Sequence, residues 1–277
     1  MPGKIPDWIK PKDFDRKAYE KTLETIERHG LNTVCIGADC PNRYECFSHG
    51  TATFMILGSV CTRGCRYCDV KHGLPEPIDD DEPERIADAV KTLGIKHAVI
   101  TCVTRDDLQD GGASQFVAVT NALHKIKCTV ELLVSDLDGN ASALKSIVSA
   151  RPDVLGHNVE TVPRLFRTLK QKGSYERSVK LLRKAKAIDK SVKTKSGMMV
   201  GLGESMDEIF ATLSDLKKAG CDFVTVGQYL QPSSSGMHVK KYYTADDFRR
   251  IKDETRELGF KCAEVGPLVR SSYHAHA

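Results

Sequence analysis

The sequence has no long apolar run. No stretch of about 18 apolar residues occurs in its 277 residues, and the first residues, MPGKIPDWIKPKDF, contain no apolar core. A membrane-spanning helix and an export signal are therefore not expected. The chain also has little excess of one charge, because 41 Lys and Arg stand against 37 Asp and Glu, a formal net charge of +4. This excess is too small to favour nucleic acid as the main partner.

Two familiar site motifs are also missing from the sequence. There is no GxSxG turn, so a serine nucleophile of the hydrolase type has no support. A structural zinc site is normally closed by four ligands, often in two CxxC pairs, and the one CxxC pair here, Cys65 and Cys68, has no second pair to close it.

Cysteine, by contrast, is abundant and clustered. Six of the ten cysteines form two triplets: Cys35, Cys40 and Cys46 with the spacing Cx4Cx5C, then Cys61, Cys65 and Cys68 with the spacing CxxxCxxC. Three closely spaced thiolates can hold three irons of a four-iron cluster and leave the fourth iron open for chemistry. Ten cysteines without an export signal indicate metal or redox chemistry in a reducing compartment, with the cytoplasm as the default location.

Short apolar runs alternate with helical stretches from residue 53 onward. The expected strands lie at 51–59, 96–103, 129–135, 153–159, 192–200 and 223–229. Each precedes a helical segment, which is typical of β-α units around a parallel sheet. Six such units predict an α/β fold, a partial (β/α)6 TIM-type barrel, although an open doubly wound sheet would give the same pattern. In both arrangements reactive loops follow the carboxyl ends of the strands, as Cys61 does here.

The chain divides into three expected segments. Residues 1–52 form an N-terminal extension with a helix at 16–28 and the first triplet, 53–264 form the barrel, and 265–277 form a tail that closes on it. Local signals support the barrel helices. Pro83 and Gly94 bracket one at 82–92, and Ser205 with Glu208 forms a capping box that opens another at 206–219.

A CxxxCxxC loop directly after the first strand resembles the signature of the radical S-adenosylmethionine superfamily. The resemblance implies that S-adenosylmethionine chelates the open iron and is cleaved to a deoxyadenosyl radical. It further implies that Tyr67 lies near the adenine and that Asn158 and Glu160 bind the ribose. From residue chemistry alone, Arg177 is a candidate fork donor to the methionine carboxylate, and Gly201 is a candidate position where backbone approaches the adenine. Ordinary packing, turn or surface roles remain open for each of these residues.

The first triplet, together with a chain end that reads RSSYHA, closely resembles the lipoyl synthase family. In that family the first triplet binds an auxiliary 4Fe-4S cluster whose fourth ligand is a serine of the tail, here Ser272, with Ser271 a close second. The implied reaction inserts two sulfur atoms at C6 and C8 of a protein-bound octanoyl-lysine, and the auxiliary cluster is the sulfur donor. The alternative from the same superfamily is a sulfur inserter like biotin synthase that acts on a free small molecule.

The expected partners follow from this resemblance. They are octanoylated lipoyl carrier proteins or domains and an electron donor of ferredoxin or flavodoxin type, with no nucleic acid and no membrane. Gln228 and Tyr229 are expected to contact the octanoyl chain, against the alternative that Tyr229 only packs in the core. An electron-transfer protein with two ferredoxin-like clusters and a zinc-dependent binding module are the competing classes.

Overall fold

Seven strands follow one another in chain order, and at least one helix follows each of the first six in the described residues. The computed structural model describes residues 5–10 and 13–273. The strands form one sheet in the order β1 to β7, and no pairing of β7 with β1 closes it among the described residues. This is the expected α/β partial barrel, extended by one strand. No helix in the described ranges is long and apolar enough to cross a membrane.

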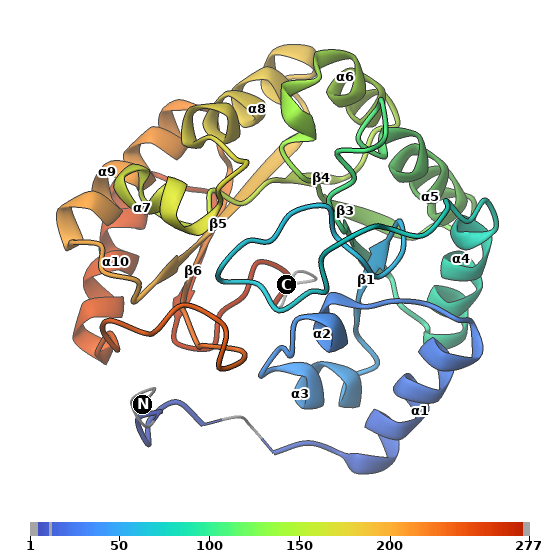
Figure 1. Ribbon diagram of the computed structural model, residues 1–277, viewed down its shortest axis with the longest axis horizontal. Helices are drawn as coiled ribbons and strands as arrows, with labels where there is room; N and C mark the ends of the chain where they lie inside the picture. The colour runs from blue at the N-terminus through green and yellow to red at the C-terminus, as the bar shows by residue number, and fades with distance from the viewer. Residues whose placement is uncertain (1–4, 11–12, 274–277) are drawn as a thin grey trace. The chain divides into compact units, whose positions relative to one another are not determined.

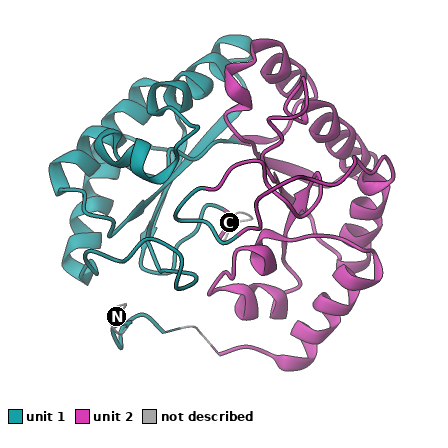
Figure 2. Cartoon of the chain, viewed as in Figure 1, with its two compact units in different colours: residues 1–10, 65–69, 156–271 teal, residues 11–64, 70–155, 272–277 magenta. Residues whose placement is uncertain are grey.

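Two compact units divide the chain (Figure 2). One consists of residues 11–64, 70–155 and 272–277, and the other of residues 1–10, 65–69 and 156–271. We call them the first-triplet unit and the β5–β7 unit. The expected segments at 1–52, 53–264 and 265–277 stay a prediction, and residues 1–4, 11–12 and 274–277 of the outer two lie outside the described residues.

The first-triplet unit holds the strands β1 (Thr53–Ile56), β2 (His97–Cys102) and β3 (Thr129–Leu133), which pair in parallel. Its helices are α1 (Arg16–Arg28), α2 (Val34–Gly37), α3 (Arg43–Ser48), α4 (Glu82–Leu93), α5 (Ala113–Lys125), α6 (Ala141–Ser149) and the 3-10 turn η1 (Leu137–Gly139). Pro83 lies in the first turn of helix α4, and Gly94 caps its end with a φ of 69°, the left-handed conformation that stops the helix. Figure 1 shows α4, α5 and α6 following one another along the outer side of this unit.

The β5–β7 unit is built in the same way. Its strands β5 (Lys193–Val200), β6 (Phe223–Gln228) and β7 (Cys262–Gly266) pair in parallel, and β4 (Val154–Gly156) lies at the boundary of the two units. The helices are α7 (Pro163–Leu169), α8 (Tyr175–Ile188), α9 (Met206–Lys218) and α10 (Ala245–Glu257). Apolar faces of α8, α9 and α10 pack on β5 and β6 around Leu182, Leu213 and Val226. In Figure 1 these three helices line the outer side of the two strands.

Candidate functional site

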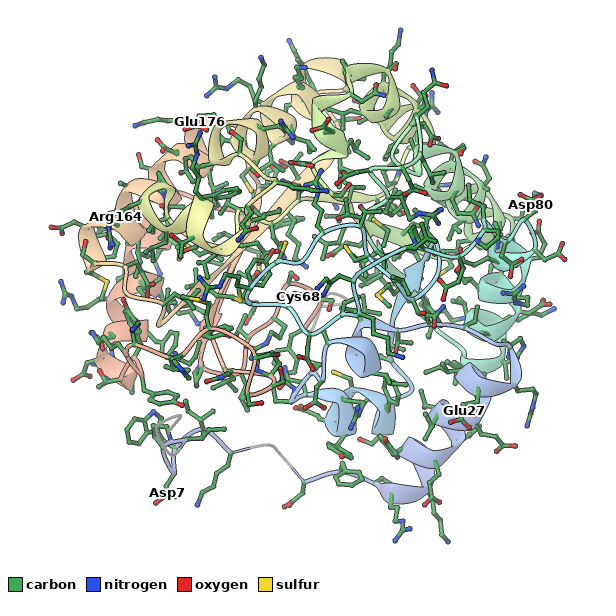
Figure 3. The ribbon with its side chains drawn as sticks, viewed as in Figure 1. Asp7, Glu27, Cys68, Asp80, Arg164 and Glu176 are labelled. Atoms are coloured by element: carbon green, nitrogen blue, oxygen red, sulfur yellow. The ribbon has the colours of Figure 1, made fainter. Side chains whose placement is uncertain are left out.

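The loop between β1 and α4 carries the second cysteine triplet (Figure 3 labels Cys68 on it). In the first-triplet unit, the Cys61 Sγ accepts hydrogen bonds from the backbone N–H groups of Arg63, at 3.4 Å, and Thr104, at 3.3 Å. In the β5–β7 unit, the Cys68 N–H donates to the Cys65 carbonyl at 3.0 Å. Backbone N–H groups therefore hold Cys61 in place and form a turn from Cys65 to Cys68, and Cys68 is the exposed member of the triplet.

Arg63, inside the second-triplet motif, anchors the start of this loop. Its guanidinium is buried, bonds both carboxylate oxygens of Asp106 at 2.7–3.1 Å, and pairs with Asp136 at 2.8 Å. Burial works against the charge of Arg63, but these two carboxylates raise its pKa above the ordinary value. The network ties the cysteine loop to the loops that follow β2 and β3. Arg63, Asp106 and Asp136 were not predicted as site residues, because a single sequence does not show which arginines are buried.

Tyr67, Asn158 and Glu160 lie together in the β5–β7 unit. Tyr67 packs on Leu169, Leu202 and Tyr229. Burial raises its pKa well above the ordinary value, and the nearby Glu160 adds to the shift. The pKa of Glu160 is raised by burial and lowered in part by Lys170 and by hydrogen bonds from Asn158 and Tyr67. The three residues predicted as cofactor contacts thus form one hydrogen-bonded group.

Asn158 has one acceptor free for a ligand. Its amide Nδ2 donates to the Ser271 hydroxyl at 3.2 Å, whereas its Oδ1 is buried without a partner among the described residues. A Cβ added at Gly197 would lie 2.9 Å from this oxygen. Glycine at position 197 therefore lets strand β5 lie close to the Asn158 side chain. A buried acceptor without a donor is costly, and the hydroxyl of a sugar would supply the missing donor. The side chains here fit the ribose of S-adenosylmethionine.

Arg177 and Gly201 lie in the same unit. Arg177 is half-buried in the first turn of α8, where its N–H bonds the Ser174 cap at 3.3 Å. Gly201 follows β5 with a φ of 110°, and its N–H donates to Glu204 at 2.5 Å. A Cβ there would lie 2.1 Å from the Gln228 amide nitrogen, so this turn requires glycine.

Gln228 and Tyr229, predicted as substrate contacts, are both buried. The Gln228 amide donates to the carbonyls of Val200, Tyr229 and Lys241 at 3.0–3.1 Å, and its oxygen accepts from the Tyr243 N–H at 2.9 Å. This gives Gln228 a structural role and lends no support to the substrate prediction. Tyr229 packs in the cluster around Leu169, and burial raises its pKa to about 12.

The three cysteines of the first triplet lie close together. Cys35 is in α2, Cys46 is in α3, and Cys40 lies between these helices, with its N–H bonded to the Cys35 carbonyl at 3.1 Å. Burial, then the neighbouring Cys35 and Cys40, raise the pKa of Cys46 to about 12. Burial and Cys40 raise the pKa of Cys35 to about 11. Each thiol therefore lies within electrostatic range of another, as ligands of one cluster must.

The tail reaches this triplet through Tyr273. Its hydroxyl donates to both carboxylate oxygens of Glu45, at 3.1 and 3.0 Å, and Glu45 directly precedes Cys46. Ser272 is the neighbour of Tyr273, whereas the hydroxyl of Ser271 is bonded by Asn158. The donor set of three thiols and an adjacent serine tail fits an iron–sulfur cluster. Among the described residues, no three His, Cys, Asp or Glu side chains converge as they would around a single ion.

Comparison with known proteins identifies the class. Residues 55–216 match the Radical SAM superfamily. The crystal structure of methylornithine synthase aligns with a TM-score of 0.59 at 12% identity, over 90% of this chain and 78% of that one. Streptococcus suis SuiB bound to S-adenosylmethionine aligns with a TM-score of 0.58 at 16% identity, over 90% of this chain and 61% of that one. The fold and the superfamily match together define a radical S-adenosylmethionine enzyme.

Closer relatives specify the family. Lipoyl synthase of Caldanaerobacter subterraneus is 49% identical over 99% of this chain and 97% of the relative. Lipoyl synthase of Rubrobacter xylanophilus is 49% identical over 98% of this chain and 85% of the relative. The chain belongs to the lipoyl synthase family. It is a sulfurtransferase that uses 4Fe-4S clusters and S-adenosylmethionine to insert two sulfur atoms into a protein-bound octanoyl chain.

Proposed function

We propose a division of labour between the two triplets. Cys61, Cys65 and Cys68 hold the cluster that binds S-adenosylmethionine. Cys35, Cys40 and Cys46, with Ser272 as fourth ligand, hold the auxiliary cluster that donates sulfur. The observation that carries the assignment of Ser272 is the bond from Tyr273 to Glu45, beside Cys46. When bound, the clusters and S-adenosylmethionine supply the radical that activates the C6 and C8 positions and the sulfur that replaces the hydrogens.

The chain's own residues bind and orient the cofactor in this proposal. Asn158 offers its unpartnered oxygen, and Glu160 its carboxylate, to the two ribose hydroxyls. Tyr67 covers the adenine from the cluster loop, and the turn at Gly201 brings backbone to its edge. Arg177 is assigned to the methionine carboxylate, because a guanidinium binds a carboxylate with two hydrogen bonds. We still assign Tyr229 to the lining of the octanoyl channel. Gln228 would stabilise the backbone that carries Tyr229 through its hydrogen bonds to backbone groups.

The remaining partners are inferred from the chemistry. Reduction of an iron–sulfur cluster needs a one-electron donor of low potential, so we assign a ferredoxin or flavodoxin. The substrates are octanoylated lipoyl carrier proteins or domains. All ten cysteines are free thiols, which suits the cytoplasm, where thiols stay reduced. We also propose that the chain is organised as an N-terminal extension at 1–52 with the first triplet, a barrel at 53–264 and a tail at 265–277 with Ser272.

Iron counting combined with mass analysis tests the proposal. After anaerobic reconstitution the wild-type chain is expected to hold about eight irons, and about four when either triplet is replaced by alanine. An octanoylated carrier incubated with S-adenosylmethionine and a reductant should gain the mass of two sulfur atoms only with both triplets intact. Turnover by a chain with Cys35→Ala and Cys40→Ala would contradict the proposal.

A further inference from the structure

The contact between Glu45 and Tyr273 joins residues 228 positions apart. The Glu45 side chain is 9% exposed, and the Tyr273 hydroxyl bonds both of its oxygens. A buried carboxylate is stable only when donors replace the water that it has lost. A hydrogen bond to a charged acceptor is about twice as strong as one between neutral groups. This contact is therefore strong enough to hold a short chain segment in place.

The helix that carries Glu45 is itself fixed. The Thr22 hydroxyl of α1 donates a hydrogen bond to the Phe47 carbonyl at 2.7 Å. The Tyr19 ring stacks on the Phe47 ring, with 5.7 Å between the ring centroids. The hydroxyl of Thr51 bonds the Cys46 carbonyl at 2.9 Å. These contacts anchor the end of α3 at Cys46 and Phe47. A tail that is fastened to Glu45 is thus fastened to a rigid element that also carries a cysteine of the first triplet.

We propose that Glu45 and Tyr273 form a latch that positions Ser272 at the first triplet. The latch rests on the proposed role of Ser272 as the fourth ligand. Neither Glu45 nor Tyr273 is a cluster ligand, so their hydrogen bonds do not depend on iron. The latch holds the tail both before Ser272 binds a cluster and after it leaves one. Tyr273 is a positioning residue, since it acts through its neighbour.

Limited proteolysis of the metal-free, full-length chain tests the latch directly. Trypsin cleaves after Arg270, and the rate of this cut follows the fraction of chains in which the tail is released. Tyr273→Phe removes only the hydroxyl and should speed the cut about ten-fold, the value expected for a bond to a charged group. Glu45→Gln keeps an acceptor and should give a smaller increase. Mass spectrometry of the released fragment measures both rates.

Tyr175→Phe is the matched control. The Tyr175 hydroxyl also donates to a carboxylate, that of Asp215 at 3.0 Å, but in the β5–β7 unit. This variant should leave cleavage after Arg270 unchanged. If Tyr273→Phe is cut at the wild-type rate, or if Tyr175→Phe speeds the cut equally, the latch is overturned.

Iron retention separates the latch from the ligand role of Ser272. In chains whose second triplet is replaced by alanine, every iron counted is bound at the first. Tyr273→Phe should lose this iron to a chelator several-fold faster than the parent chain, and Ser272→Ala faster still. If Ser272→Ala retains iron like the parent while Tyr273→Phe still frees the tail, the ligand role fails and the latch stands. If Ser272→Ala loses iron and Tyr273→Phe does not, the latch fails alone.

Discussion

At the scale of single residues, the two serines of the RSSY tail have different surroundings. The Ser271 hydroxyl accepts from Asn158, and Ser272 precedes the tyrosine that bonds Glu45. This contrast favours Ser272 over Ser271 as the cluster ligand. It also connects Ser271 with the orientation of Asn158, whose opposite oxygen faces Gly197.

The first prediction concerns these serines. Ser272→Ala should lower the iron bound at the first triplet and abolish sulfur insertion, because three thiolates then hold a cluster with an open corner. Ser271→Ala should retain that iron but weaken S-adenosylmethionine binding by about three- to ten-fold, since Asn158 loses one hydrogen bond of roughly 1 kcal/mol. Iron analysis and equilibrium binding measure the two effects. Loss of first-triplet iron in Ser271→Ala alone would reverse the assignment.

The second prediction concerns Arg63. Arg63→Met leaves Asp106 and Asp136 without their buried cation, and the Asp136 side chain is fully buried. We expect a loss of about 3 kcal/mol or more in the free energy of unfolding, which lowers Tm by roughly 6–12 °C. Arg164→Met is the control, because Arg164, which is labelled in Figure 3, is 57% exposed in its ion pair with Glu208. The Tm of this variant should stay close to wild type. Thermal unfolding of the metal-free chains is the measurement.

At the scale of elements, the buried strands and the capped helices could be predicted from the sequence. The helix 16–28 and the capping box of Ser205 and Glu208 agree with the structure, and each expected strand contains one observed strand. Strand β7 was missed because it is short and only half-buried, so its residues show no apolar run. A helix was expected after the strand at 223–229, but the bounds of α10, which has a capping box at Thr244 and follows a long loop, were not predicted.

The third prediction concerns the turn after β5. Gly201 and Gly203 have nearly the same φ, 110° and 111°, so alanine is strained equally at both. They differ in space, because a Cβ at Gly201 would meet Gln228 and the Lys241 carbonyl, whereas one at Gly203 has its nearest contact at 3.7 Å. Gly201→Ala should therefore destabilise the chain by about 1–3 kcal/mol more than Gly203→Ala. Equal losses in chemical denaturation would show that no close packing restricts Gly201.

The fourth prediction concerns the amino ends of β5 and β6. Burial opposes the charge of Asp222, but bonds from Lys186, Lys261 and the Thr194 N–H lower its pKa to about 2, from an ordinary value of 3.8. A lowered folded pKa stabilises the fold above the unfolded pKa, and this contribution is lost as the pH falls through about 2.

Asp222→Asn should consequently cost about 1–2 kcal/mol near pH 6. The difference from wild type should begin to shrink below about pH 4 and be mostly gone at pH 2. Urea denaturation of the two chains across this range measures it. A difference that grows as the pH falls would contradict the sign of the shift.

At the scale of the whole molecule, the spacing of the cysteines predicted the kind of chemistry, whereas contacts between residues far apart in the chain could not be predicted. Both cysteine triplets are local motifs, so metal or redox chemistry could be inferred from the sequence without a structure. The bond between Glu45 and Tyr273 joins two polar residues that share no periodic pattern, and only the fold brings them together. The same reason explains why the backbone role of Gln228 was not foreseen.

The separation of Glu45 and Tyr273 along the chain also sets the time that passes between their synthesis on the ribosome. A ribosome that adds about 5–20 residues per second needs roughly 10–50 s to make the 228 residues between them. Over that interval β1, β2 and β3 can already pair, because each lies beside its neighbour in sequence. The three thiols of the first triplet are therefore made well before Ser272 and Tyr273. Translation itself imposes an order of assembly in which the site that we propose for the auxiliary cluster is completed only after its thiols and the first three strands have been made.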